Sequence, residues 1–93
     1  MQILQTSIFK RAVKKLHVNQ KKCLDNAIRD LLSNPRVGDE KIGNLSSIRV
    51  YKFRMIDLLT LLAYKYDQHE ESIILLALGS HENFYRDLKT HIN

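Results

Sequence analysis

The stretch that decides the fold runs from Ile73 to Lys89 and reads IILLALGSHENFYRDLK. Its first six residues are continuously apolar, which is typical of a short strand buried on both faces. The apolar run then meets Gly79 and Ser80, which are turn-forming residues. A polar segment with helical spacing follows. The stretch therefore predicts a strand over Ile73–Leu78 that ends at a glycine turn, followed by a closing helix over Glu82–Ile92.

Two reactive side chains lie near the start of this predicted helix. On a helix that begins near Ser80, His81 and Tyr85 are four residues apart and share one face. The positive end of the helix dipole disfavours protonated His81 and is complemented by Glu82, so a neutral imidazole can act as a general base. Tyr85 can exchange a proton through its hydroxyl or stack on a base. The alternative is that these residues only start a helix and cover the core, and the sequence leaves both interpretations open.

Two further strands are expected upstream of this stretch. Residues Ile48–Met55 are β-branched and aromatic with interleaved cations, and Leu58–Tyr66 is an almost continuous apolar run. The connections Met55–Asp57 and Asp67–Glu71 are short enough to be hairpin turns. The three strands are therefore expected to form an antiparallel meander.

The N-terminal half has the pattern of one short strand and two amphipathic helices. Met1–Gln5 can form the strand, and Thr6 or Ser7 is expected to cap the first helix. The apolar residues of this helix recur at i, i+3, i+4 and i+7, which predicts a single buried stripe. Asn19 is expected to cap the second helix, which ends at the single proline. Arg36–Ser47 is expected to be a loop.

Together these elements predict an α+β fold of order β-α-α-β-β-β-α. We expect a small antiparallel sheet with an N-terminal helical hairpin and a C-terminal helix, forming a single domain over 1–93. The composition, with 44% apolar and 27% charged residues, is ordinary for a soluble protein. The chain start lacks a signal-peptide pattern, and no apolar run could span a bilayer. A single cysteine fits a reducing compartment, so we expect a cytoplasmic protein with no membrane partner.

The positive charge is concentrated at one end of the chain. The formal net charge is +5, and residues 1–36 contain eight Lys and Arg against two Asp, so the remainder is close to neutral. Lys14 and Lys15 are expected on the solvent side of the first helix. A basic half favours RNA, DNA or an acidic protein as partner, and the alternative is an ordinary solvated helix face.

A second group of cations lies on the first strand of the predicted meander. Strand alternation places Lys52 and Arg54 on one face and Arg49 on the other. Two cations that project together can hold a phosphate and offset the charge of a pentacoordinate transition state, and the alternative is again a solvated face. The four histidines and one cysteine lack zinc-site spacing, and no glycine-rich phosphate loop is present. No metal and no cofactor is expected.

Four segments resemble the RelE/ParE superfamily of toxins from bacterial type II toxin–antitoxin modules: FKRAVKKL, KIGNLSSIRVYKFR, LLTLLAYKY and LLALGSHENFYRDLK. The resemblance covers nearly the whole chain, and GSHENFYRDLK is its most specific part. It implies a RelE-like (microbial-RNase-like) fold and a cognate antitoxin as partner. RelE-type members cleave mRNA without a metal, usually in the ribosomal A site. ParE-type members instead inhibit DNA gyrase and lack the catalytic set, and other members nick DNA.

The resemblance implies a role for five residues of this chain. His81 falls where RelE-type members place a catalytic Arg or His after the last strand. Tyr85 falls at or near the aromatic residue of the last helix that stacks on or protonates the substrate. Lys52 and Arg54 match the cations of the family's second strand, and in the expected mechanism they stabilise the phosphorane. With Glu82 as an alternative base to His81, these residues form the expected catalytic set of an endoribonuclease.

The remaining expectations concern RNA binding and one departure from the family pattern. Further cations expected to bind RNA are Arg49, Lys14, Lys15 and Lys89. Many RNases of this family have an arginine early in the strand that follows the cationic one. This chain has Leu58 and Leu59 there, so either Arg49, Lys52 or Arg54 supplies the stabilising charge, or the activity is weaker or different.

Overall fold

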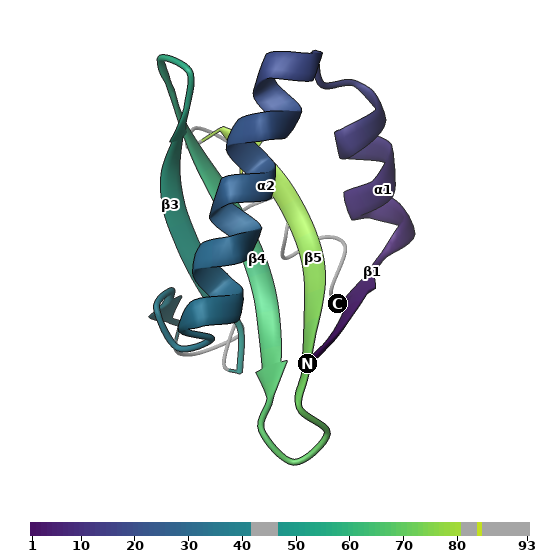
Figure 1. The fold of residues 1–93 in the computed structure, drawn as a ribbon, viewed down its shortest axis with the longest axis vertical. Helices are drawn as coiled ribbons and strands as arrows, with labels where there is room; N and C mark the ends of the chain where they lie inside the picture. The colour runs from purple at the N-terminus through teal and green to yellow at the C-terminus, as the bar shows by residue number, and fades with distance from the viewer. Residues whose placement is uncertain (42–46, 81–83, 85–93) are drawn as a thin grey trace.

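The computed structural model describes residues 1–41, 47–80 and 84. Its elements, drawn in Figure 1, are β1 (Gln2–Gln5), α1 (Ser7–Lys14), α2 (Val18–Ser33), β2 (Asp39–Glu40), β3 (Arg49–Met55), β4 (Leu58–Asp67) and β5 (Ser72–Ser80). They form an α+β fold with a five-stranded sheet of order β1-β5-β4-β3-β2. Within the described residues, no helix is both long enough and apolar enough to cross a membrane.

The antiparallel meander expected from the sequence is confirmed. β3 pairs with β4, and β4 pairs with β5, both antiparallel. The sheet as a whole is mixed, however, because β1 pairs in parallel with β5. The contact continues past the strand, where the Thr6 amide donates to the Leu75 carbonyl at 3.1 Å. A strand of four exposed residues has no alternation that could predict its direction, so the expectation of a wholly antiparallel sheet was wrong on this point.

The segment Arg36–Ser47 contains a strand that the sequence did not predict. Asp39 pairs with Val50 and Glu40 with Arg49, which makes β2 a two-residue edge strand. Asp and Glu are poor strand formers, so propensity gave no signal there. The pairing is decided by the tertiary contacts that hold the preceding residues against β3 and β4.

The caps of the two helices follow the sequence rules in one case and depart from them in the other. Thr6 caps α1 as predicted, since its Oγ1 accepts from the Phe9 amide at 3.1 Å. The prediction that Asn19 caps α2 was wrong, because α2 starts at Val18 and its N-cap is His17. Gln20, three residues after the cap, accepts the His17 amide proton through Oε1 at 2.8 Å and so satisfies the helix start. Figure 1 shows the two helices running antiparallel, as expected for a hairpin.

The last strand continues through the residues that were expected to form a turn. β5 extends to Ser80, with Gly79 paired to Leu61 and Ser80 to Thr60. Space at Gly79 is tight, because a Cβ there would lie 3.3 Å from Cδ1 of Phe84. The glycine thus marks a close approach of another side chain to a strand, which is the second common reason for glycine in that setting. The predicted helix Glu82–Ile92 lies outside the described residues, apart from Phe84.

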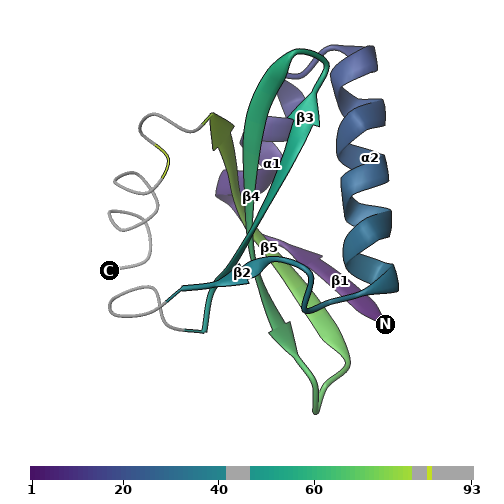
Figure 2. The ribbon, with the colours of Figure 1, turned by 90° about the vertical axis from the view of Figure 1, so that its left-hand side faces the viewer.

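Hydrophobic residues are buried on both faces of the sheet. One cluster lies under the helices, which Figure 2 shows on one side of the sheet, and comprises Phe9, Leu24, Leu31, Met55, Leu62, Tyr64, Ile73 and Leu75. The other cluster lies on the opposite face and comprises Ile48, Val50, Leu61, Ala63 and Phe84. β4 contributes to both clusters, which explains its continuous apolar sequence.

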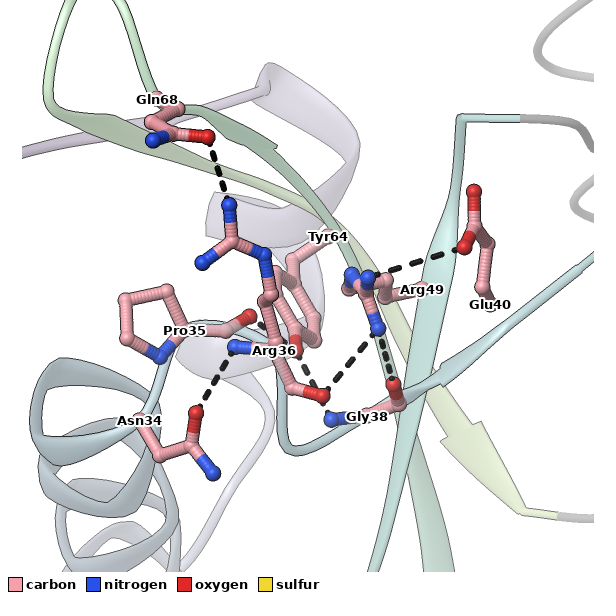
Figure 3. Close-up of polar contacts among 8 residues, drawn as sticks. All are labelled: Asn34, Pro35, Arg36, Gly38, Glu40, Arg49, Tyr64 and Gln68. Atoms are coloured by element: carbon pink, nitrogen blue, oxygen red, sulfur yellow. Dashed lines mark hydrogen bonds and ion pairs between the residues drawn. The ribbon is translucent and has the colours of Figure 1, made fainter.

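A buried tyrosine holds the connection from α2 to β2 against the sheet (Figure 3). The Tyr64 hydroxyl donates to the Pro35 carbonyl at 2.7 Å and accepts from the Gly38 amide at 2.9 Å. A Cβ at Gly38 would lie 2.7 Å from Cε1 of Tyr64, so only glycine allows this approach. Burial raises the pKa of Tyr64 above 10.0, an effect that the Gly38 amide and the charge of Arg49 partly offset.

We expect Tyr64→Phe to lower the free energy of unfolding by about 2 kcal/mol, because the variant leaves the Gly38 amide buried without its acceptor. Urea denaturation followed by circular dichroism measures this change. Tyr66→Phe is the matched control, since Tyr66 is a partly buried tyrosine whose ring lies under the Arg36 guanidinium. Equal stability of the two variants would contradict a role for the Tyr64 hydroxyl.

The raised pKa of Tyr64 adds an alkaline signature to the same experiment. Folding favours the protonated phenol, so its contribution is complete below the unfolded pKa of about 10 and is lost as the pH rises through the higher folded value. Wild-type stability should therefore fall more steeply above pH 10 than that of Tyr64→Phe.

Candidate functional site

Two exposed cations lie on β3, and Lys52 projects from the face of the sheet opposite the helices. Val50 on this face is buried against Phe84, and strand alternation places Lys52 and Arg54 on the same side as Val50. Lys52 lies in one row across the sheet with Leu61 of β4 and Gly79 of β5. The shared face predicted for these two cations is therefore present in the structure.

Arg54 lies at an open edge of the sheet. β2 pairs only with the start of β3, so the second half of β3 is an edge. Arg54 lines a hollow of about 180 Å³ whose other lining residues are Cys23, Asn26, Ala27, Asp30 and Phe53. Its Nη1 lies 3.4 Å from the Asp57 carbonyl oxygen, which is a weak hydrogen bond. The guanidinium is thus exposed at the border between the two faces, while Lys52 belongs to one face alone.

Phe84 lies on the face of the sheet that carries Lys52. Phe84 is 5% exposed and packs in one cluster with Val50, Leu61 and Ala63. Four residues of the expected site lie outside the described residues, namely His81, Glu82, Tyr85 and Lys89. They follow Ser80 in the sequence, and Phe84 is the described residue of this part of the chain.

Arg49 differs from the other two cations of β3 in its surroundings. Its Nη1 donates to the carbonyls of Arg36 at 3.1 Å and Gly38 at 2.8 Å. Its Nη2 lies 3.7 Å from Oε2 of Glu40. These contacts, shown in Figure 3, hold the residues before β2 against the sheet. Arg49 therefore positions backbone, and fewer of its donors remain for a phosphate than at Lys52.

Lys14 and Lys15 lie at the end of α1 and are exposed. Lys15 lines a groove of about 380 Å³ between this helix end and the β3–β4 hairpin. The floor of the groove is apolar and includes Leu16, Met55 and Leu78. These lysines thus lie on the helix side of the sheet, across its end from Lys52.

One polar pair was not predicted from the sequence. The Tyr51 hydroxyl donates to Oδ2 of Asp30 at 2.7 Å, and this hydrogen bond is the main cause of a raised Tyr51 pKa, with burial and the Asp30 charge adding to it. Tyr51 also stacks on Phe53, with ring centroids 6.1 Å apart. The pair joins α2 to β3, and two residues 21 positions apart leave no local signal.

In the described part of the chain, no cluster of three or more His, Cys, Asp or Glu could hold a metal ion.

The described residues supply charge stabilisation, and the expected acid–base groups follow Ser80. Lys52 and Arg54 can bind a phosphate and stabilise charge that develops on it. Leu59 pairs with Arg54 across the strands. It lies in the region where many ribonucleases of the resembling family have an arginine. The two cations on β3 therefore suit a ligand that carries a phosphate.

Comparison with known proteins gives one family and one fold. A family model described as the ParE-like toxin of type II bacterial toxin–antitoxin systems matches residues 3–89. Among curated protein sequences, no significant match is found. Several solved structures share the fold at low sequence identity.

Three of these structures are bacterial toxins. An Escherichia coli RelE toxin with two arginines replaced by alanine, in the free state, is 16% identical with a TM-score of 0.76, covering 99% of this chain and 97% of that one. The toxin in the intact E. coli RelBE toxin–antitoxin complex is 16% identical with a TM-score of 0.72, covering 87% and 96%. A YoeB/ParE toxin from Agrobacterium tumefaciens is 11% identical with a TM-score of 0.68, covering 87% and 99%.

The different surroundings of the β3 cations predict different effects on stability. We expect Arg49→Ala to lower the free energy of unfolding by about 1–2 kcal/mol, because two backbone carbonyls lose a charged donor. Lys52→Ala should stay within about 0.5 kcal/mol of the wild type, since Lys52 is an exposed side chain. Thermal or urea denaturation of the two variants tests the contrast. A destabilising Lys52→Ala with a neutral Arg49→Ala would reverse the assignment.

Proposed function

Because the chain belongs to the family of ParE-like toxins of type II bacterial toxin–antitoxin systems, we propose that it arrests growth as a metal-independent endoribonuclease that cleaves mRNA. The observation that carries this proposal is the exposed pair Lys52 and Arg54 on the face to which Phe84 returns. His81 and Tyr85 flank Phe84 in the sequence, and the proposal brings them close to the two cations. An RNA phosphodiester between them would contact groups of both kinds.

The spacing of the sheet supports this arrangement. Lys52 and Gly79 lie in one row two strands apart, so their Cα atoms are about 10 Å from each other. His81 follows Gly79 by two residues. A phosphate held by the long Lys52 side chain over Leu61 would therefore lie within reach of side chains that follow Ser80.

The proposed reaction is attack of the ribose 2′-oxygen on the adjacent phosphorus. His81 or Glu82 removes the 2′-hydroxyl proton as general base. Lys52 and Arg54 stabilise the phosphorane. Tyr85 or protonated His81 gives a proton to the leaving 5′-oxygen, so the products end in a 2′,3′-cyclic phosphate and a 5′-hydroxyl. DNA lacks the 2′-hydroxyl nucleophile and is not a substrate for this route.

The proposal also names partners and a compartment. A solved relative is the toxin of an intact toxin–antitoxin complex, and we propose that a cognate antitoxin likewise neutralises this chain. The exposed Lys14 and Lys15, together with Lys89, are proposed to bind the phosphates of mRNA or of the ribosome. Both targets are cytoplasmic, which is therefore the proposed location.

Gyrase inhibition without catalysis is the second candidate. It is favoured by the family description as ParE-like and by Leu59, which lies opposite Arg54 where ribonucleases of the superfamily often have an arginine. Under this alternative, the cations would bind protein or DNA instead of stabilising a phosphorane. The two functions differ in what happens to RNA.

We expect induced expression without an antitoxin to halt growth with rapid loss of intact mRNA. Mapping of RNA 5′ ends shortly after induction should show new 5′-hydroxyl ends, because cleavage leaves the 5′-oxygen protonated. Growth arrest with stable mRNA and an induced DNA-damage response would contradict cleavage and support gyrase as the target.

In single-turnover cleavage of RNA, we expect His81→Ala to reduce the rate by about 10²-fold, the usual size of a lost acid–base contribution. Lys52→Ala combined with Arg54→Ala should also reduce the rate at saturating substrate, because these cations are proposed to act on the transition state. Lys14→Glu is the matched control for charge. It should weaken binding and lower its salt dependence while the saturated rate stays close to wild type.

The two halves of this experiment can fail separately. A fully active His81→Ala variant at equal concentration would remove His81 from the mechanism. If the cleavage rate at saturating substrate is unchanged in the Lys52 and Arg54 double variant, no described residue remains to stabilise the phosphorane. Gyrase inhibition would then be the better supported function.

A further inference from the structure

The turn between β3 and β4 holds a residue in a conformation that its side chain disfavours. Met55 and Leu58 form the last pair of the hairpin, so the loop has two residues, Ile56 and Asp57. Ile56 has φ 60°, while Asp57 is not among the residues with positive φ. This pattern is that of a type II′ turn, whose first central residue is usually glycine. A β-branched residue in the left-handed region is a genuine outlier and costs free energy.

The same turn exposes apolar surface that folding does not use. We call Ile56, Leu58 and Leu59 the hairpin tip. Ile56 is 53% exposed, Leu58 54% and Leu59 39%. Glycine at position 56 would relieve the strain and would remove exposed apolar surface, so neither the backbone nor the core explains isoleucine there. Strain of this kind is found where a side chain serves a function.

The hairpin tip has cations on both sides. Leu59 pairs with Arg54 and lies on the face of Lys52, whereas Leu58 lines the groove that also contains Lys15. Asp57 is the only acidic residue from Arg49 to Tyr66, and its carbonyl oxygen faces Nη1 of Arg54. An apolar projection between two positive surfaces suits a nucleic acid, because its phosphates carry the negative charge and its bases have apolar faces.

We propose that the hairpin tip is a nucleobase wedge that inserts into single-stranded RNA whose phosphates lie on Lys52, Arg54 and Lys15. The inference rests on the proposed function and adds to it the part of the protein that separates the bases. Apolar side chains that insert between base steps unstack them in other nucleic-acid complexes. Two to three aliphatic side chains match the face of a base, whereas a stable protein interface needs about 800 Å² on each partner. The size of the tip therefore favours a base over a protein surface.

The test measures binding and stability in the same variants. The probe is a short single-stranded RNA with 2′-O-methyl groups, which block the nucleophile, and with 2-aminopurine at successive positions. Ile56→Gly should weaken binding about fivefold by loss of apolar contact, with an unchanged salt slope because the phosphate contacts remain. The same variant should raise the melting temperature by about 4 °C, because glycine accepts the positive φ.

Two further variants separate the side chain from the backbone. Ile56→Asn also tolerates positive φ and should weaken RNA binding like Ile56→Gly, without the flexibility of glycine. Val37→Ala is the matched control, since Val37 is an exposed apolar residue in the connection before β2, and it should bind like the wild type. Wild-type binding should raise 2-aminopurine fluorescence at one position by unstacking, and both Ile56 variants should lose this rise.

The outcomes are distinguishable. Wild-type affinity and fluorescence in both Ile56 variants would overturn the wedge while leaving the proposed RNA cleavage intact. Unchanged RNA binding together with toxicity that the antitoxin no longer suppresses would also overturn it and would assign the tip to a protein contact. A wild-type protein that neither binds nor cleaves RNA would overturn the proposed function itself.

Discussion

Burial of β4 on both faces is the constraint on which the rest of this structure depends. Leu61, Leu62, Ala63 and Tyr64 are consecutive and fully buried, so each face of the sheet needs its own cover. The two helices cover one face, and Phe84 covers part of the other. Lys52 lies on this second face and is exposed.

The three cations of β3 show how neighbours decide the use of one kind of side chain. Arg49 lies where β2 pairs with β3, and two carbonyls from the preceding connection accept its protons. Lys52 lies beyond the end of β2 and remains exposed. Tyr64 and Arg49 together hold the chain that leads into β2, so stability and charge presentation come from adjacent parts of one strand. An exposed cation such as Lys52 can therefore be replaced with little effect on the stability of the fold.

The site and the hairpin tip share a physical logic in which function opposes stability. Exposed cations near one another repel, and exposed leucines beside a strained isoleucine add nothing to the core. Such features persist where a ligand supplies the missing interactions. For a toxin of this family, RNA would provide both, with phosphates for the cations and bases for the apolar tip. The absence of an arginine at Leu59 would then be a change in how the substrate is held, from charge to apolar contact.

Periodicity within single elements makes four features predictable from the sequence: the α+β class, the two helices, the three-stranded meander and the shared face of Lys52 and Arg54. Tertiary structure alone decided the parallel pairing of β1, the formation of β2 and the anchoring role of Arg49, since each depends on residues distant in sequence. Gly79 illustrates the limit: its turn signal was clear, yet it lies within β5, where it pairs with Leu61 and Phe84 packs close to it. Local sequence patterns indicate which conformations a segment can adopt, whereas tertiary contacts with other segments determine which of them it adopts.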